Sequence, residues 1–229
     1  MVNVKFFKGN PNPQAATFEV NADLLGSFGK VVITRAGKVI QYSPLAQMLF
    51  TSGPKGNGSD LSRIDVAYNN GKTYITLARK ALKWKDAEIA AAENFLSGFF
   101  QQGQSALYTT ALANNIAVHP SFKAQSPVHE LVQNTFHEQV NPIISQHGGA
   151  MELMDVELKS SGEIYADVAL IGACNGCGSA ETDTLSGATD RIRQVLAAAK
   201  SQNPDNPSVQ KLDFKDIRIK QIPEIVLAR

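Results

Sequence analysis

Apolar periodicity runs through most of this chain of 229 residues but fails between about residues 114 and 125. That stretch contains His119-Pro120, and a proline moves the residue before it away from helical backbone. An unpatterned segment between two patterned regions is typical of an interdomain linker. We therefore predict two small domains, 1–113 and 126–229, joined by the linker 114–125, and each domain must bury its own core.

Residues 1–113 carry strand patterns and two helix signals. Ser43-Pro44 is predicted to begin a helix, because serine caps a helix N-terminus and the N–H that proline lacks is not needed in the first turn. Asp86 begins a second helix, which continues to Phe99. The glycine-rich stretch 53–59 has no phosphate-binding signature and is interpreted as a connecting loop. Strands are expected at 3–8, 15–20, 31–34, 62–68 and 73–78.

Residues 126–229 predict the order α-β-β-α-β. Ser126-Pro127 starts a helix that ends near His147-Gly148-Gly149, because glycine readily adopts the left-handed backbone of a helix stop. Next are expected strands at 150–158 and 163–171, a helix with an apolar stripe from Leu185 to Ala199, and a strand around 214–220. The expected fold class is mixed α+β and α/β, in two small domains.

Cys174 and Cys177 are the only cysteines of the chain, and they lie on the loop between the second strand and the following helix. Glycines at 172, 176 and 178 allow backbone N–H groups to approach the sulfurs, and the N-terminus of the next helix carries partial positive charge. Both effects favour thiolate over thiol. A thiolate pair of this kind either binds metal or takes part in disulfide exchange.

Two thiolates do not complete the four-ligand set of a zinc site or of most iron–sulfur clusters. The histidines do not supply the rest, because all four precede the cysteines without zinc-finger spacing: His119, His129, His137 and His147. Ala173 stands where a thioredoxin-like site usually has an aromatic residue. These residues favour a [4Fe-4S] cluster shared by two copies of the chain, and they leave open a dithiol redox pair, a zinc site or inert thiols.

Several other residues have plainer interpretations. His147 is expected to be a turn residue beside the glycine pair, and His137 is expected to be solvated. Asp183 and Glu181 complement a helix dipole rather than assist chemistry. The helically spaced aromatic residues of the first domain are expected to belong to its core: Phe95, Phe99 and Phe100.

Composition narrows the expected partners. A formal net charge of +1 implies no nucleic-acid or anionic-membrane partner, and no apolar run is long enough to cross a bilayer. The segment Met1 to Lys8 lacks the apolar core and cleavage site of a signal peptide. We expect a cytoplasmic protein, and a lone C-x-x-C in a reducing compartment indicates metal binding or redox chemistry rather than a structural disulfide.

The second domain resembles the NifU-type C-terminal domain of the Nfu family. The resemblance rests on a helix, two strands and a Gly-x-Cys-x-x-Cys loop in this order, with these matching pieces: Asn141-Pro142, His147-Gly148-Gly149, Gly172 to Cys177 and, less closely, Thr184 to Gly187. The first domain resembles the Nfu N-terminal domain through two further segments: Asn10-Pro11-Asn12-Pro13 with Phe18, and Ser43-Pro44-Leu45-Ala46 with Leu49-Phe50.

The resemblance implies a carrier or scaffold, not an enzyme. Such a protein binds a [4Fe-4S] cluster through Cys174 and Cys177 at a homodimer interface and passes it to apo client proteins by thiolate exchange. Its other partner is an upstream donor scaffold, and the first domain serves docking or structure. Two positions depart from the family pattern. Residue 150 is alanine instead of an acidic residue, and Thr184-Leu185 lies one residue late although Gly187 keeps its place.

Overall fold

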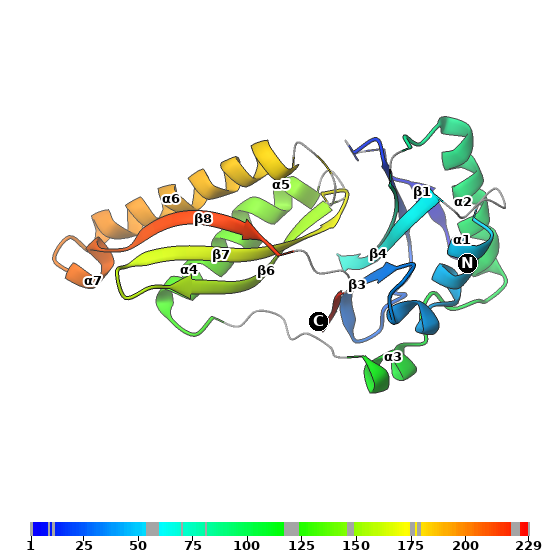
Figure 1. Cartoon of the computed structure of the whole chain (residues 1–229), viewed down its shortest axis with the longest axis horizontal. Coiled ribbons are helices and arrows are strands. Elements are labelled where there is room, and N and C mark those ends of the chain that lie inside the picture. Colours follow the sequence, from blue (N-terminus) through cyan, green and yellow to red (C-terminus); the bar gives the residue numbers. More distant parts are fainter. Residues whose placement is uncertain are drawn as a thin grey trace. The chain divides into compact units, whose positions relative to one another are not determined.

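The computed structural model describes the chain in two compact units. Its description leaves out residues 1, 9, 11, 54–59, 70, 81, 117–123, 146–148, 175, 176, 178, 179, 221–224 and 229. Unit 1 comprises Met1–Ser121 with Ile222–Arg229, and unit 2 comprises Phe122–Gln221 (Figure 1). Each unit has its own sheet and helices, which confirms the predicted mixed α and β fold class. None of the helices in the described ranges is both long and apolar enough to span a membrane.

Unit 1 is built on a six-stranded sheet in the order β1-β2-β5-β4-β3-β9, in which all neighbouring strands are antiparallel. Its strands are β1 Val4–Phe6, β2 Ala15–Val20, β3 Phe28–Thr34, β4 Leu61–Asn69, β5 Lys72–Arg79 and β9 Ile225–Ala228. Its helices are the 3₁₀ turn Val39–Tyr42, α1 Pro44–Thr51, α2 Asp86–Gln101 and α3 Thr109–Asn115. The strands predicted in residues 1–113 are confirmed, and α3 is an addition.

One sheet face and the helices enclose the core of unit 1. Ser43 caps α1 as predicted, because its side chain accepts a hydrogen bond from the Ala46 N–H at 3.1 Å. The three phenylalanines of α2 lie in or against this core, as expected. Phe99 and Phe100 are buried, and Phe95 stacks on Phe99 with 6.4 Å between ring centroids.

The last strand of the chain corrects the predicted domain boundary. β9 pairs antiparallel with β3, with Val226 opposite Val31, so the final residues belong to the sheet of unit 1 rather than to a second domain ending at residue 229. Val226 is 1% exposed in the core of unit 1. A four-residue apolar strand carries no sequence signal for which distant edge it joins, and for this reason the boundary was misplaced.

Unit 2 has a three-stranded sheet in the order β6-β7-β8 with helices on one face (Figure 1). Its elements are α4 Pro127–Thr135, α5 Asn141–Ser145, β6 Gly149–Leu158, β7 Glu163–Gly172, α6 Leu185–Gln202, α7 Pro207–Gln210 and β8 Asp213–Ile219. β6 and β7 form an antiparallel hairpin, whereas β8 pairs parallel to β7 after a crossover through α6. The predicted order of strands and long helices is confirmed.

The parallel pairing of β7 and β8 is reinforced by a buried carboxylate. Asp167 on β7 is 5% exposed and accepts from Arg218 Nε at 2.6 Å, while Lys220 Nζ lies 3.1 Å from its other oxygen. A buried carboxylate needs such partners to offset the loss of hydration. These pairs hold β8 beside β7.

The first helix of unit 2 begins as predicted but is not uniform. Ser126 caps α4 by accepting from the His129 N–H, and Pro127 occupies the first turn. A π-helical segment, Phe136–Val140, separates α4 from α5. The core of unit 2 joins this helical region to the inward faces of β6 and β7 and includes Cys174.

Candidate metal-ligating site at the Cys174 and Cys177 loop

The cysteine loop lies at the carboxyl end of β7, where the crossover to α6 begins. Gly172 ends the strand with φ of 65°, a left-handed conformation that glycine adopts without steric penalty. The Cys177 N–H then donates to the Cys174 carbonyl oxygen at 3.3 Å, which makes a turn containing both cysteines. In parallel sheets this end of a strand is where binding loops gather. The predicted strand-to-helix position of the pair is confirmed by these neighbours.

Gly149, the first residue of β6, makes room for the Cys174 side chain. It pairs with Gly172 across the hairpin, and a Cβ at position 149 would lie 2.3 Å from Cys174 Sγ and 3.0 Å from the Cys174 backbone nitrogen. No real side chain fits at these distances. Position 149 is therefore restricted to glycine. This glycine was predicted to help stop the first helix, but it instead begins β6 and makes room for the sulfur.

Cys174 lies in an apolar environment. Its side chain belongs to the core of unit 2, and the residue is 6% exposed. Burial, together with the nearby charge of Cys177, raises the pKa of the Cys174 thiol to about 12, although a backbone hydrogen bond with Ala150 acts against the rise. The sequence-based expectation of two stabilised thiolates is therefore wrong for Cys174 in the chain by itself, because desolvation outweighs the backbone hydrogen bond.

Cys177 is the more accessible of the two sulfurs. It is partly exposed and packs against the edge of the unit 2 core, whereas Cys174 is buried. One cysteine of the pair is therefore partly accessible at the surface, and the other is buried in the core. This asymmetry is a property that the C-x-x-C spacing alone does not reveal.

Ala150 contacts the site through its backbone. Because the hydrogen bond with Cys174 comes from main-chain atoms, the alanine that replaces the acidic residue of the family pattern leaves this contact in place. The side chain of residue 150 is only partly buried. The first departure from the pattern therefore leaves this backbone contact intact.

A π-helical segment, Ala180–Thr184, precedes α6 and bears on the second departure. A π turn closes with an i→i+5 hydrogen bond and holds one more residue than an α turn. This is the local structure that absorbs a one-residue displacement of Thr184-Leu185. Leu185 still packs against the core of unit 2, and Ala188 and Ile192 are buried on the predicted stripe.

Asn141 is a positioning residue that sequence reasoning did not single out as functional. Its Nδ2 donates to the Met151 carbonyl oxygen and its Oδ1 accepts from the Met151 N–H, both at 2.9 Å. This paired contact fixes the start of α5 to β6, two residues after Gly149. A signal was present, because Asn141-Pro142 is one of the family-like pieces, but its partner Met151 lies on β6, beyond the end of the helix.

The histidines do not add ligands to the cysteine pair within the described residues. His129 is committed elsewhere, since Nδ1 meets the Ser126 hydroxyl and Nε2 lies 3.0 Å from the Val156 carbonyl oxygen. His137 is exposed, as expected. His119 and His147 lie outside the described residues. Where the structure describes side chains, no group of three or more metal-binding residues occurs.

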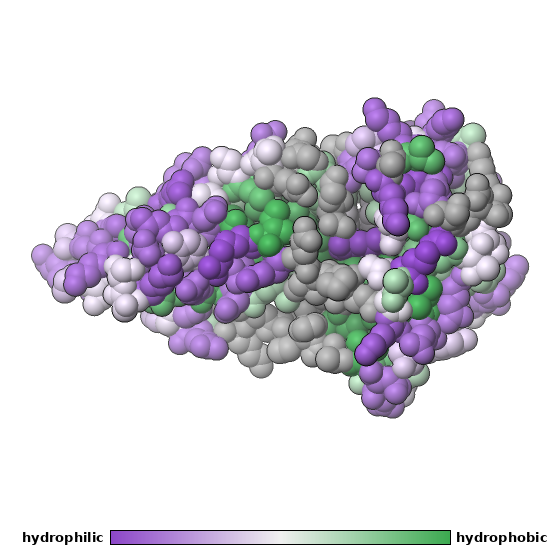
Figure 2. All heavy atoms as spheres, in the orientation of Figure 1, coloured by the Kyte–Doolittle hydropathy of each residue, from purple (hydrophilic) through white to green (hydrophobic). Residues whose placement is uncertain are grey.

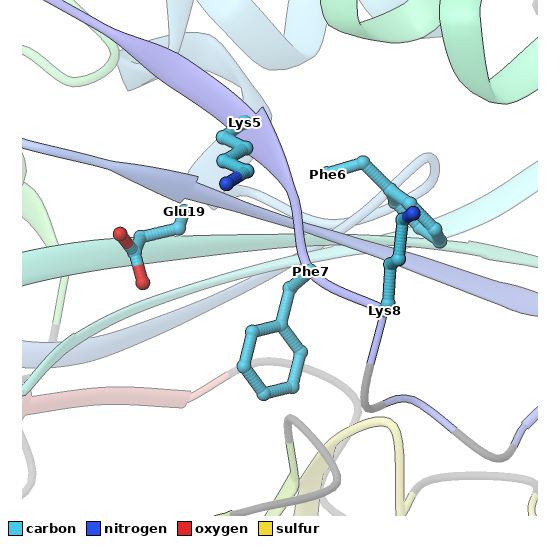
Figure 3. Close-up of a pocket in the computed structure, with 5 residues that line it drawn as sticks. All are labelled: Lys5, Phe6, Phe7, Lys8 and Glu19. Atoms are coloured by element: carbon cyan, nitrogen blue, oxygen red, sulfur yellow. The ribbon is translucent and has the colours of Figure 1, made fainter.

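Unit 1 has a surface cavity of about 390 Å³ beside β1 and β2, but its residues suggest no chemistry (Figure 3). It is lined by Lys5, Phe6, Phe7, Lys8 and Glu19. Glu19 is paired with Lys72 at 2.7 Å, and the Phe6 N–H is bonded to Glu93 Oε2 at 2.7 Å. The lining contains no thiol and no histidine, so the cysteine loop is the candidate site.

Comparison with known proteins places the site in a recognised domain. Residues 132–201 match the model of the NifU-like domain, so the chain carries a NifU-like domain that includes both cysteines. The predicted resemblance to Nfu proteins is thereby confirmed for unit 2. The matched residues lie within unit 2, and the resemblance of unit 1 to the Nfu N-terminal domain stays a prediction.

Curated relatives carry the name Fe/S biogenesis protein NfuA. Those of Pseudomonas savastanoi pv. phaseolicola, Pseudomonas syringae pv. tomato and Pseudomonas syringae pv. syringae are each 32% identical over 68 residues. The alignment covers 30% of this chain and 34% of each relative, so the match spans about a third of the relatives' length. No solved structure matches the chain.

Proposed function

We propose that this chain, with its NifU-like domain at residues 132–201, is an iron–sulfur cluster carrier. Cys174 and Cys177 bind the cluster, a second copy of the chain supplies two further thiolates, and the [4Fe-4S] cargo passes to apo client proteins. The chain receives the cluster from an upstream scaffold, acts in the cytoplasm and catalyses no bond-making chemistry of its own. The function of unit 1 is to dock clients or to support the fold.

The observation that carries this proposal is the isolated sulfur pair at the end of β7. Two cysteines with two residues between them fit one edge of a cluster, and no group of three or more metal-binding residues occurs among the described side chains. Four thiolates are the usual ligand set of a [4Fe-4S] cluster. A two-fold axis through two such loops completes that set with identical residues.

Release follows from the same incomplete ligand set. An acceptor thiolate forms a bond to iron as one bond from iron to Cys177 or Cys174 breaks, so each iron keeps its number of sulfur ligands. The proton lost by the acceptor thiol balances the one taken up by the freed cysteine, and no oxidation state changes. Cys177 exchanges first because it is the exposed sulfur, and Cys174 follows.

Anaerobic reconstitution with iron and sulfide tests the proposal. The native chain should gain the visible absorbance of an iron–sulfur cluster, and Cys174→Ala or Cys177→Ala should lose stable cluster binding with an unchanged circular dichroism spectrum. Ser186→Ala, on an exposed turn of α6, is a matched small-residue control and should bind like the native chain. A cysteine variant that keeps the full absorbance would sink the assignment of ligands.

The dithiol oxidoreductase is the competing outcome of the same experiment. A chain that stays colourless after reconstitution but reduces a model disulfide catalytically, with loss of turnover in Cys177→Ala, would replace the carrier by a redox enzyme. The carrier predicts no such turnover.

A further inference from the structure

We propose that Ile143 and Pro142 on α5 form the apolar contact through which a second copy of this chain seats against the cysteine loop. The inference rests on the proposed function, since the second copy is what completes the ligand set. It adds a protein surface to an interface otherwise defined by the cluster alone.

Ile143 is the most exposed of the large hydrophobic residues that the structure describes in unit 2. Its exposed fraction is 63%, compared with 40% for Leu158 and 36% for Ile219. Pro142 beside it is also exposed. A single apolar side chain on a surface needs no explanation by itself. Ile143 is significant because it lies at the same end of unit 2 as the cysteine loop, which a second copy must cover in the proposed carrier.

The exposure of Ile143 is imposed by the fold and is not due to a frayed helix end. Ile144, the next residue, is 3% exposed in the core of unit 2, and Asn141 is bonded twice to Met151. The Ser145 hydroxyl donates to the Pro142 carbonyl oxygen at 3.0 Å. With α5 fixed on both sides of it, the Ile143 side chain is held outward before any partner arrives, which lowers the entropy lost on binding.

α5 and the cysteine loop belong to the same end of unit 2. Ile144 and Cys174 are members of one hydrophobic cluster, and α5 lies beside the start of β6, where Gly149 contacts Cys174. Figure 1 shows α5 next to the start of α6, at the end opposite α7. Figure 2 shows hydrophobic atoms gathered toward this end of unit 2, whereas the α7 end is mainly hydrophilic.

The occupant is a second copy because the site is incomplete without one. In a two-fold interface each surface meets its own counterpart, so each of the two copies contributes one Ile143 to the apolar contact. Unit 2 carries nine Lys and Arg against thirteen Asp and Glu, so two copies repel each other electrostatically. An apolar contact opposes that repulsion at the place where the loops must meet.

Ile143→Lys in the full chain tests the proposal, with Leu158→Lys as a matched control. Leu158 is also an exposed apolar residue of unit 2, but it ends β6, about 30 Å along the strand from Gly149. Each variant is reconstituted anaerobically with iron and sulfide, and its dimerisation is measured by sedimentation over a range of protein concentrations. We expect Ile143→Lys to weaken the dimer at least tenfold and Leu158→Lys to leave it unchanged. Ile143→Ser, which adds no charge, should weaken it by a smaller factor.

The possible results separate this inference from the proposed function. If Ile143→Lys dimerises like the native chain, the apolar contact is overturned while the carrier stands. If the Ile143→Lys variant dimerises normally but transfers its cluster to an apo-ferredoxin more slowly, then α5 contacts the acceptor, and the assignment of this surface to a second copy is wrong. If the native chain takes up no iron, the proposed function fails first. Thermal unfolding of each variant verifies that the fold is retained.

Discussion

Units 1 and 2 each place helices against one face of a sheet, but their connections differ. Unit 1 has only antiparallel neighbours in its sheet and closes with a strand from the far end of the chain. Unit 2 contains a parallel pair, β7 and β8, which requires the crossover through α6. That crossover creates a loop between a strand end and a helix start, and both cysteines lie there. The candidate site of this chain therefore lies where a parallel connection is made, in the unit with the smaller sheet.

Gly149→Ala is expected to have the largest effect, because residue 149 lies directly against Cys174 in unit 2. The new methyl would overlap Cys174 Sγ, so the sulfur must shift, cluster uptake should fall severely, and stability should drop by about 1–3 kcal/mol. Gly187→Ala in α6 is the matched control. Its methyl meets nothing within 4 Å, and it should stabilise the helix by about 0.5–1 kcal/mol. For each variant, iron content measures cluster uptake and denaturant unfolding measures stability. Normal iron binding by Gly149→Ala would contradict the close packing of Gly149 against Cys174 Sγ.

Val226→Ala tests unit 1, because Val226 lies on β9, the strand from the end of the chain that joins the sheet of that unit. Removing two methyl groups from this buried position should destabilise unit 1 by about 2 kcal/mol. Cluster uptake should be unchanged, because β9 belongs to unit 1 and the cysteine loop belongs to unit 2. Chemical denaturation followed by the fluorescence of Trp84, in unit 1, reports the first effect, and iron content reports the second. Loss of iron binding in this variant would break the functional separation of the units.

Asn141→Ala should destabilise unit 2 by about 1–2 kcal/mol, because the Met151 N–H and carbonyl lose their partners in a partly buried place. Asn203→Ala removes an exposed bond to the Ala199 carbonyl and should change stability by less than about 0.5 kcal/mol. Hydrogen exchange of the β6 amides distinguishes the two. Equal protection of β6 in both variants would show that the asparagine clamp is unimportant.

Alkylation compares the two sulfurs directly. Cys177 should react with iodoacetamide at least tenfold faster than Cys174 at pH 8, because Cys174 is buried and remains a thiol well below its pKa of about 12. Labelling of Cys174 should accelerate as pH rises toward that value, since the reactive thiolate becomes more abundant. Mass spectrometry of peptides gives both rates. Equal rates at pH 8 would mean that Cys174 is not enclosed in the core.

Local signals predicted much of this fold. Ser43 and Ser126 begin helices because their hydroxyls accept backbone N–H groups within the same turn. The alternation from Ile164 to Leu170 places one face of β7 in the core. Such features depend on neighbours a few residues away, and the printed sequence contains all of them.

Long-range partners could not be predicted in the same way. Nothing near Val226 indicates that β9 joins β3, and nothing near Asn141 names Met151. The depth of Cys174 also depends on residues far along the chain, including Gly149. The C-x-x-C spacing pointed to Cys174 and Cys177 as candidate ligands, but the difference in burial between the two sulfurs arises only from packing.

The native mass and iron content of the reconstituted full chain show whether two copies share one cluster. We expect a cluster-dependent dimer with about two irons per chain, which returns to monomers when the iron is chelated. A monomer that holds a complete cluster, or a colourless monomer after reconstitution, would contradict it.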